Sequence, residues 1–590
     1  MAISASRPRM DVDRVIVVSR CVPVAASHHR ARHPALTPIN AGRSDPGEAT
    51  ARAADRLPEK RGVMHEADDT VLECIRSSLF AGVPAERIET VTTHISIVLL
   101  GGETAVKLKR PVKRPYVDFS TSALRLAACE RELDLNRRTA PQLYRAVRRI
   151  TRAPGRGLAL DGGGELVDAV VEMRRFDADG LLDRRAMEGT LTGPLMDRLA
   201  RTIAAFHETI PPDPAPDGAM RMAAVLDINE AAFAATELFG GEETDRFNRR
   251  FRRELARLGP LLDGRAKAGR VRRCHGDLHL RNICTVDGEP VLFDCLEFDE
   301  ALGTTDTLYD LAFLLMDLWH RGLEEFANRV LNRYLDATRD EGGLPALPFF
   351  MAVRAAVRAH VGAAQLSDAG PRASDIRAEA QRYFALALDL LKPRPARLIA
   401  VGGLSGSGKS TVAAALAPRI GPAPGARTLS SDRIRKRLCG VSAETRLEAN
   451  AYTSDTTERV YAAMAADAEH ILRLGYGVVA DATFERAVDR SRIAATARDA
   501  GVDFQGLWLD VDPAEMLRRV AARRNDPSDA TTAIVRQQLA RDPGDIDWER
   551  IDGDGEPERV AETARRAVDR QGEHLQRSRQ GRDARDTELG

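Results

Sequence analysis

Apolar and polar residues alternate in short stretches between residues 88 and 174, which is the period of β-strands. The pattern predicts strands over 88–92, 95–100, 104–108, 143–148 and 169–174. One helical stretch, 120–138, lies between the third and fourth of these strands. The region therefore predicts a small antiparallel sheet with one helix packed against it.

Apolar residues recur at helical spacing beyond Asp177. The predicted helices are 195–209, 229–239, 243–265, 305–321, 324–338, 348–365 and 376–391. Two short strands, 283–286 and 290–293, flank Asp287-Gly288, which is a hairpin signal. Strands followed by helices predict an α+β domain up to residue 391.

Two prolines within residues 392–395 end the last of these helices. Strands then alternate with helices, over 397–401, 427–429, 477–480 and 504–509. That order is typical of an α/β domain whose parallel sheet is covered on both faces. The two ends of the chain lack sustained apolar periodicity, so we expect them to be disordered. The predicted divisions are 1–62 (disordered extension), 63–393 (first domain), 394–572 (second domain) and 573–590 (disordered tail).

Charge and cysteine usage exclude several classes of protein. The chain of 590 residues carries 87 basic and 87 acidic residues, so a nucleic acid or an anionic membrane is not an expected partner. No apolar run approaches the roughly 18 residues of a membrane span. The seven cysteines lack metal-ligand spacing, and His279 and Cys274 lack further soft ligands nearby, so no zinc site is predicted. Reduced thiols are typical of a cytoplasmic protein, which is the predicted location.

The segment GLSGSGKST lies where an apolar strand turns into a helix. Its glycines let successive backbone N–H groups converge on an anion, and the helix N-terminus adds positive potential. We expect Lys409 to reach the β- and γ-phosphates of a nucleotide and the Ser410 hydroxyl to ligate Mg²⁺. The predicted nucleotide-binding residues are Gly403, Ser405, Gly406, Ser407, Gly408, Lys409, Ser410 and Thr411.

Two aspartates follow other strands of the same domain. Asp481 ends the strand at 477–480 and is predicted to hold Mg²⁺ through water. Asp432 follows the strand at 427–429 and is predicted to accept the proton of a substrate hydroxyl, with Arg433 or Arg435 pairing an acidic substrate. Alternatively, Asp432 only caps the next helix.

Four arginines lie on a later helix that leads into a polar turn at 525–529. They are predicted to clamp the nucleotide when a short lid closes, and Arg523 is favoured because it lies nearest the turn. A solvated basic helix face is the other interpretation.

A second group of candidate residues surrounds the predicted hairpin. His275 begins the sequence HGDLHLRN, and Asp294 follows the second hairpin strand. Phosphoryl transfer to a hydroxyl needs a carboxylate that orients or deprotonates the nucleophile, and oxygen ligands that hold Mg²⁺. Asp277, Asn282 and Asp294 supply that set in this order.

The pattern HGDxxxxN followed by a strand that ends in Asp resembles the aminoglycoside phosphotransferase and choline kinase group, relatives of the protein kinases. The resemblance covers about residues 65–391. It implies that Asp277 is the catalytic base, that Asn282 and Asp294 are catalytic Mg²⁺ ligands, and that His275 supports the loop.

The same resemblance implies a lysine on a strand and an acidic partner on a helix. Lys107 resembles the lysine that contacts the α- and β-phosphates of ATP, and Glu132 is the chosen ion-pair partner. Glu130 is the alternative, because the sequence does not say which helix face points inward. The chain departs from the protein kinases in having no GxGxxG before Lys107, only Gly101-Gly102 in a tight turn.

Residues 92–96, 107–119, 135–138 and 306–318 resemble a bacterial family in which such a domain is fused to a P-loop kinase. The arginine-rich helix resembles the lid of gluconate-kinase-like and zeta-toxin-like kinases. The implied fold class is a two-lobed, protein-kinase-like α+β domain followed by an α/β P-loop NTPase domain with a three-layer parallel sheet. ATP is expected between the sheet lobe and the helical lobe of the first domain, and on the P-loop of the second.

These features predict an ATP- and Mg²⁺-dependent phosphotransferase with two nucleotide sites, which acts on hydroxyl groups of small molecules. The acceptors and the oligomeric state are left open. The alternative is a regulatory protein, in which one nucleotide-binding domain controls the other without transferring phosphate. A nucleic-acid-processing ATPase is a third class, against which the zero net charge and the lack of helicase-like motifs argue.

Overall fold

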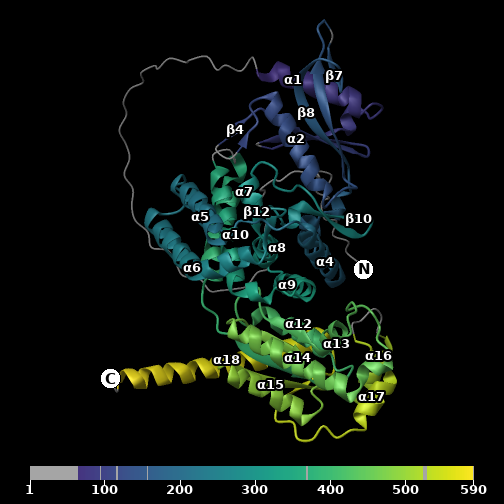
Figure 1. The fold of residues 1–590 in the computed structure, drawn as a ribbon, viewed down its shortest axis with the longest axis vertical. Helices are drawn as coiled ribbons and strands as arrows, with labels where there is room; N and C mark the ends of the chain where they lie inside the picture. Colours follow the sequence, from purple (N-terminus) through teal and green to yellow (C-terminus); the bar gives the residue numbers. More distant parts are fainter. Residues whose placement is uncertain are drawn as a thin grey trace, which may run out of the picture. The chain divides into compact units, whose positions relative to one another are not determined.

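A computed structural model describes residues 64–588, apart from residues 94, 115–116, 156, 367–369 and 523–527. The chain forms two compact units, which divide between Ala178 and Asp179 (Figure 1). The predicted disordered extension, residues 1–62, lies outside the described range.

The first unit is built on a six-stranded antiparallel sheet with the strand order β1-β2-β3-β8-β6-β7. Its strands are β1 (Glu89–Thr92), β2 (Ser96–Gly101), β3 (Thr104–Lys109), β6 (Tyr144–Arg152), β7 (Leu158–Leu160) and β8 (Glu165–Arg174). A separate two-stranded ribbon pairs β4 (Lys113–Arg114) with β5 (Val117–Asp118). The predicted antiparallel sheet is confirmed, and the short strands β4, β5 and β7 are additions that the periodicity did not reveal.

The sheet is covered by α1 (Met64–Leu79) and α2 (Ser122–Arg137) (Figure 1). Strand alternation places Val106 and Leu108 of β3 in one apolar cluster with Ile75 of α1. Lys107 and Lys109 therefore point to the opposite face, where both contact α2. A helix lies on each face of the sheet, whereas the sequence predicted only one helix packed against it.

The second unit, residues 179–588, begins with a helical lobe that ends at residue 391. Its helices are α3 (Leu182–Met187), α4 (Gly193–Thr209), α5 (Gly218–Ala234), α6 (Gly241–Lys267), α7 (Glu300–Gly303), α8 (Thr307–His320), α9 (Glu324–Thr338), α10 (Leu347–Ala364) and α11 (Ala373–Leu390). Two antiparallel pairs of short strands interrupt the helices: β9 (Val271–Arg273) with β12 (Thr304–Asp306), and β10 (Ile283–Val286) with β11 (Glu289–Leu292).

Helix α5 differs from the helix predicted over 229–239. It begins eleven residues earlier and ends at Ala234. Its buried positions, Met222, Leu226, Asn229 and Phe233, recur every three or four residues. The buried stripe thus includes a polar residue, Asn229, which a search for apolar periodicity does not register.

The P-loop domain, residues 394–588, has a five-stranded parallel sheet with the order β14-β15-β13-β16-β17. Its strands are β13 (Arg397–Gly402), β14 (Arg427–Ser430), β15 (Val478–Asp481), β16 (Asp503–Asp510) and β17 (Glu549–Asp552). Its helices are α12 (Lys409–Leu416), α13 (Ser431–Leu438), α14 (Ser454–Arg473), α15 (Ala487–Asp499), α16 (Pro513–Ala522), α17 (Thr532–Leu539) and α18 (Pro557–Glu588). The predicted strands are confirmed, and β17 is an added edge strand.

Both faces of this sheet are buried. Ile399 and Val401 of β13 pack in one apolar cluster with residues of α12 and α18. Leu398 and Ala400, which point the other way, belong to a cluster with residues of α14 and α15. The domain is therefore a three-layer α/β fold, as predicted (Figure 1).

Helix α18 continues to Glu588, through the residues for which the sequence predicted a disordered tail. The segment 573–588 contains no proline and one glycine, and many of its residues are Glu, Gln, Arg and Ala. These residue types favour a helix even where no apolar stripe is present, which explains why the segment is helical and not disordered as predicted.

The helical lobe and the P-loop domain share one buried apolar cluster and a polar contact along β14. β14 is an edge strand, and the side chain of Asn332 from α9 covers its free edge. The Asn332 amide accepts a hydrogen bond from Thr428 N (2.7 Å) and donates one to Ala426 O (3.1 Å), as a neighbouring strand would. Asn328 also donates to Ala426 O (2.9 Å).

Replacing the buried Asn332 by Ala is expected to destabilise the second unit by about 1–3 kcal/mol, because the partly buried Thr428 N–H loses its partner. Urea unfolding of the full chain measures this loss. Arg201→Gln is the matched control, since it removes an exposed contact to Glu444 and should cost less than about 1 kcal/mol. Equal effects of the two substitutions would contradict the role given to Asn332.

Candidate active sites

The HGDxxxxN loop of the helical lobe, called the catalytic loop after its predicted role, joins β9 to β10 and contains Asp277. Asn282 donates from Nδ2 to Asp277 Oδ2 (2.8 Å) and to the Asp277 backbone oxygen (3.0 Å). A quarter of the Asp277 side chain (25%) is exposed, so one part of the carboxylate is held and another is open to a ligand. The structure brings these two predicted residues into direct contact.

Helix α8 fixes the backbone of this loop with two carboxylates. Asp310 accepts from Gly276 N (2.7 Å) and His275 N (3.2 Å), and Asp317 accepts from Leu280 N (3.1 Å). Residues 310 and 317 lie two helical turns apart and face the same side. The loop is therefore tied to the helix on both sides of Asp277.

His275 joins the loop to the strand end that carries Asp294. Its Nε2 lies 3.0 Å from Phe293 O, and its Nδ1 lies 3.4 Å from Asp277 N. Asp294 itself adopts a left-handed conformation with φ of 60°, which costs free energy in a residue other than glycine. Strain of this kind is retained where a side chain must be aimed, which is consistent with a ligand role for Asp294.

The surroundings of Asp277 favour its charged form. Burial alone would raise the pKa of Asp277, but His279, His275 and Arg358 lower it below its usual value. His279 Nε2 lies 3.4 Å from Asp277 Oδ1. Asp277 is thus a carboxylate, and not a carboxylic acid, over the physiological pH range.

Lys107 in the first unit forms an ion pair with Glu132 of α2, with 2.9 Å between Nζ and Oε1. Glu132 is fully buried and also pairs with Lys109, whereas Glu130 is exposed. Burial raises the pKa of Glu132, but the two lysines outweigh it and bring the pKa to about 2. The structure selects Glu132 over Glu130 as the partner, while the role of Lys107 toward a nucleotide stays a prediction.

The P-loop connects β13 to α12 and is shaped by backbone that only glycine adopts easily. Gly406 has φ of 91°, and a Cβ there would lie 2.7 Å from Met516 O of α16. Lys409 donates from Nζ to Leu404 O (2.8 Å) across the loop. The loop therefore has the glycine conformations that a phosphate-binding loop requires, while the binding of a phosphate by its amides stays a prediction.

Ser410 and Asp481 meet at the carboxyl edge of the sheet. The Ser410 hydroxyl donates to Asp481 Oδ2 (2.7 Å), and Asp481 is buried. A hydroxyl and a carboxylate in contact form an oxygen donor set of the kind that Mg²⁺ prefers. These two residues fit the ion that the sequence assigned to them.

Asp432 lies in the first turn of α13, inside the helix. The N-cap position is Ser430, whose side chain makes no capping bond, so Asp432 is not the N-cap. Burial raises the pKa of Asp432, against the opposing effects of Ser528, Lys409 and Arg435. A carboxylate with a raised pKa is suited to accept a proton.

A cavity of about 590 Å³ surrounds these groups. Arg518 and Arg519 of α16 line it, whereas the favoured lid residue, Arg523, lies outside the described residues. Gln538 of α17 also lines the cavity and accepts from Ser405 N (2.9 Å), a P-loop amide. No sequence signal distinguished Gln538 from other polar helix residues. Other lining residues include Lys409, Asp432, Arg435, Tyr452, Asp481 and Thr483.

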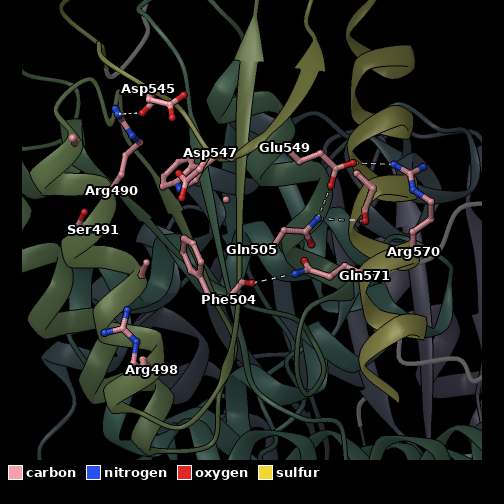
Figure 2. Close-up of a pocket in the computed structure, with 15 residues that line it drawn as sticks. Arg490, Ser491, Arg498, Phe504, Gln505, Asp545, Asp547, Glu549, Arg570 and Gln571 are labelled. Atoms are coloured by element: carbon pink, nitrogen blue, oxygen red, sulfur yellow. Dashed lines mark hydrogen bonds and ion pairs between the residues drawn. The ribbon is translucent and has the colours of Figure 1, made fainter. Parts of the chain in front are cut away.

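A second cavity of the P-loop domain, about 920 Å³, lies among α15, β16, β17 and α18 (Figure 2). Figure 2 shows Glu549 between Gln505 and Arg570, and both pairs are bonded, at 3.0 Å and 2.9 Å. Arg490 donates to the backbone oxygens of Pro543 and Asp545. Gln505, Glu549, Arg570 and Arg490 are thus engaged by other groups of the protein.

His207, Cys274 and Asp310 form the one group of potential metal ligands found among residues that the structure describes, with ligand atoms within 4.8 Å of one another. Each nitrogen of His207 already has a protein partner: Nδ1 lies 3.0 Å from the Tyr334 hydroxyl and Nε2 lies 3.1 Å from Asp310 Oδ2. The group is a buried hydrogen-bond network that supports the catalytic loop. Within the described part of the chain, no helix is both long and apolar enough to span a membrane.

Comparisons with known proteins match both parts of the chain. Residues 116–347 match the phosphotransferase enzyme family, and residues 398–542 match an AAA domain. The uncharacterized proteins Rv2004c of Mycobacterium tuberculosis and Mb2027c of Mycobacterium bovis are each 32% identical over 489 residues, covering 80% of this chain and 93% of theirs.

Two solved structures are similar to one part each. A choline/ethanolamine kinase family protein from Mesorhizobium loti is 16% identical, covers 55% of this chain and 94% of its own, and has a TM-score of 0.36. A gluconokinase from Sinorhizobium meliloti 1021 is 21% identical, covers 32% of this chain and 99% of its own, and has a TM-score of 0.24.

The family matches define a protein in which an α+β domain of the phosphotransferase enzyme family precedes an α/β AAA domain that carries the P-loop. The chain belongs to the same family as the mycobacterial proteins, with which it shares most of its length.

Gly276→Ala is expected to disrupt the catalytic loop, because the new Cβ would lie 2.8 Å from Leu296 Cβ. Gly288→Ala is the matched control: its φ is also 83°, but no atom lies within 4 Å of the added Cβ. Both variants carry backbone strain of about 1–3 kcal/mol, and only Gly276→Ala adds an overpacking cost of similar size. Thermal unfolding of the two variants measures the difference, and equal melting temperatures would contradict it.

Proposed function

We propose that the protein is an ATP- and Mg²⁺-dependent phosphotransferase with two separate nucleotide sites, each transferring the γ-phosphoryl group to a hydroxyl of a small molecule. The observation that carries the proposal is the presence of two independent sets of groups for this chemistry. One set contains Asp277, Asn282 and Asp294, and the other contains Lys409, Ser410, Asp432 and Asp481.

At each site the aspartate accepts the proton of the acceptor hydroxyl, while the oxygen of that hydroxyl forms a bond to the γ-phosphorus. The bond from that phosphorus to the β–γ bridging oxygen breaks, and ADP leaves. Asp277 has this role in the helical lobe and Asp432 in the P-loop domain. Lys107, held by Glu132, and Lys409 are the cations that we assign to nucleotide phosphates.

Mg²⁺, when bound, would neutralise phosphate charge. Asn282 and Asp294 are the residues that would hold it in the first site, and Ser410 and Asp481 in the second. The direct Ser410–Asp481 bond and the strained backbone of Asp294 support this assignment.

The acceptor of the P-loop site is proposed to carry an anionic group. Arg435 lines the cavity beside Asp432 and is only 6% exposed. Its guanidinium contacts Ala451 O, the Thr457 hydroxyl and the Tyr452 ring, but its Nε has no partner and no described carboxylate forms an ion pair with it. A buried cation that no described carboxylate contacts directly favours an anionic ligand.

A nucleotide-binding regulatory protein is the second candidate. The observation in its favour is the β2–β3 turn, which offers only Gly101 and Gly102 where protein kinases have a glycine-rich loop. The hydrogen-bonded Asp277 and Asn282 favour catalysis instead. The first experiment below distinguishes the two.

The ATP turnover of the full chain is expected to be the sum of turnover at the two sites. Asp277→Asn should lower turnover at the first site, and Lys409→Ala turnover at the P-loop site, each by about 10²–10⁴-fold. The double variant should lack turnover. Asp287→Asn and Lys392→Ala, at an exposed turn and an exposed helix end, are the matched controls. A double variant that hydrolyses ATP like the parent would refute both site assignments, and loss of turnover in Lys409→Ala alone would favour the regulatory function of the first domain.

The two sites should differ in pH dependence. Burial raises the pKa of Asp432, whereas His279, His275 and Arg358 hold the pKa of Asp277 below its usual value although burial opposes them. A general base works only when unprotonated, so turnover at the P-loop site should fall at a higher pH than turnover at Asp277 as the solution is acidified. The pH profiles of Asp277→Asn and Lys409→Ala report the two sites separately. Superimposable acid limbs would contradict the assignment of the two bases.

Arg435→Gln is expected to weaken binding of acidic hydroxyl compounds to the full chain by about 10-fold or more. Suitable probes are glycerate and glycerol 3-phosphate, with glycerol as the neutral control, titrated in the presence of a nonhydrolysable ATP analogue. Arg437→Gln is the control variant, since Arg437 lies on the same helix but pairs with Asp467. Equal affinity of the parent and Arg435→Gln for all three probes would refute the anionic acceptor and leave the nucleotide sites untouched.

A further inference from the structure

Helix α9 is connected to both catalytic regions of the second unit, through side chains on its opposite faces. Asn332 and Asp336, one turn apart, point to the P-loop domain, where they contact β14 and α13. Tyr334, which lies between them in sequence, points to the interior of the helical lobe, where its hydroxyl lies 3.0 Å from His207 Nδ1. A displacement of this one helix would therefore change its contacts both with the P-loop domain and with the interior of the helical lobe.

On the P-loop side, Asp336 holds both ends of the corner that carries Asp432. One carboxylate oxygen lies 2.8 Å from Arg427 Nη1, at the start of β14, and the other lies 3.2 Å from Arg433 Nη1, directly after Asp432. Arg427 is 2% exposed and makes a further contact to Glu341 (3.3 Å). Loss of Asp336 would leave part of a buried positive charge uncompensated at the base of this corner.

On the other side, a short chain of hydrogen bonds leads from α9 to the catalytic loop. The Tyr334 hydroxyl meets His207, His207 Nε2 lies 3.1 Å from Asp310 Oδ2, and Asp310 accepts from the amides of His275 and Gly276. Every member of the chain is buried, so water does not compete for these bonds. The last amide in the chain belongs to the residue that precedes Asp277.

We propose that α9 is a shared positioning element, which sets the location of Asp432 through Asp336 and that of Asp277 through Tyr334, and so couples the two phosphotransferase sites. Asp336 and Tyr334 are positioning residues, because each acts through other residues and neither is one of the groups assigned to the reaction. The inference goes beyond the proposed function and rests on it only in taking Asp432 and Asp277 as the groups that are positioned. Contiguous packing of this kind carries coupling when both sites bias the same element.

The first test compares Asp336→Asn with Glu325→Gln in the full chain. Both substitutions remove one carboxylate charge from α9, but Glu325 pairs with Arg565 of α18 and touches neither β14 nor α13. Amide hydrogen exchange of residues 427–438 should speed up by about tenfold or more in Asp336→Asn and stay unchanged in Glu325→Gln. Equal exchange in the two variants would overturn the role of Asp336.

A kinetic readout separates positioning from folding. In the Asp277→Asn background, where ATP turnover reports the P-loop site, Asp336→Asn should lower kcat about tenfold and leave KM for ATP within about twofold. Asp336→Glu, which keeps the charge, should recover part of the loss. Faster exchange without a fall in kcat would make Asp336 merely structural, and a fall in kcat without faster exchange would equally overturn the proposal.

The second test addresses coupling between the sites. Tyr334→Phe removes one hydroxyl, whose partner His207 lies in the helical lobe, yet it should speed up exchange in residues 274–282 and also in 427–438. A nonhydrolysable ATP analogue can bind the Lys409→Ala variant only at the first nucleotide site. If α9 couples the sites, this binding should slow exchange in residues 427–438 of the P-loop domain. Changes confined to 274–282 in both experiments would refute the coupling while leaving the proposed phosphotransferase activity standing.

Discussion

The buried carboxylate of Asp310 holds the catalytic loop of the helical lobe in place before any substrate arrives. It accepts hydrogen bonds from two consecutive backbone amides, and His207 and Arg354 favour its charged form although burial opposes it. The bend at Gly276, the aim of Asp277 and the contact with Asn282 all depend on this anchor. Groups held in place in advance need little reorganisation during the reaction, which is where preorganised sites gain their rate.

The P-loop domain meets the same chemical demand by other means. Its P-loop is shaped by glycine conformations, Lys409 bonds across the loop to Leu404 O, and Ser410 bonds to Asp481. Burial raises the pKa of Asp432, whereas neighbouring cations lower that of Asp277. One chain thus carries two aspartates in opposite electrostatic environments, and helix α9 lies between the elements that position them.

The sequence was most informative where chemistry dictates local spacing. The P-loop, the HGDxxxxN loop and the strand ends at Asp294 and Asp481 were predicted, because their residues act through short-range geometry. Long-range contacts were harder to predict: whether Glu132 or Glu130 faces Lys107 depends on how α2 lies on the sheet. Asn332 on the edge of β14 and Gln538 on the P-loop had no local signal, since a polar helix residue acquires such a partner only in the folded chain. The path of α18 past residue 572 was missed because helix propensity without an apolar stripe gives a weak pattern.

We propose that one chain contains two separate sites for phosphoryl transfer from a nucleotide. The most direct test of this proposal is the stoichiometry of binding, measured by titration calorimetry of the full chain with a nonhydrolysable ATP analogue and Mg²⁺. We expect two equivalents per chain for the parent and one for Lys409→Ala, whose remaining site lies outside the P-loop domain. A single equivalent in the parent, abolished by Lys409→Ala, would contradict it.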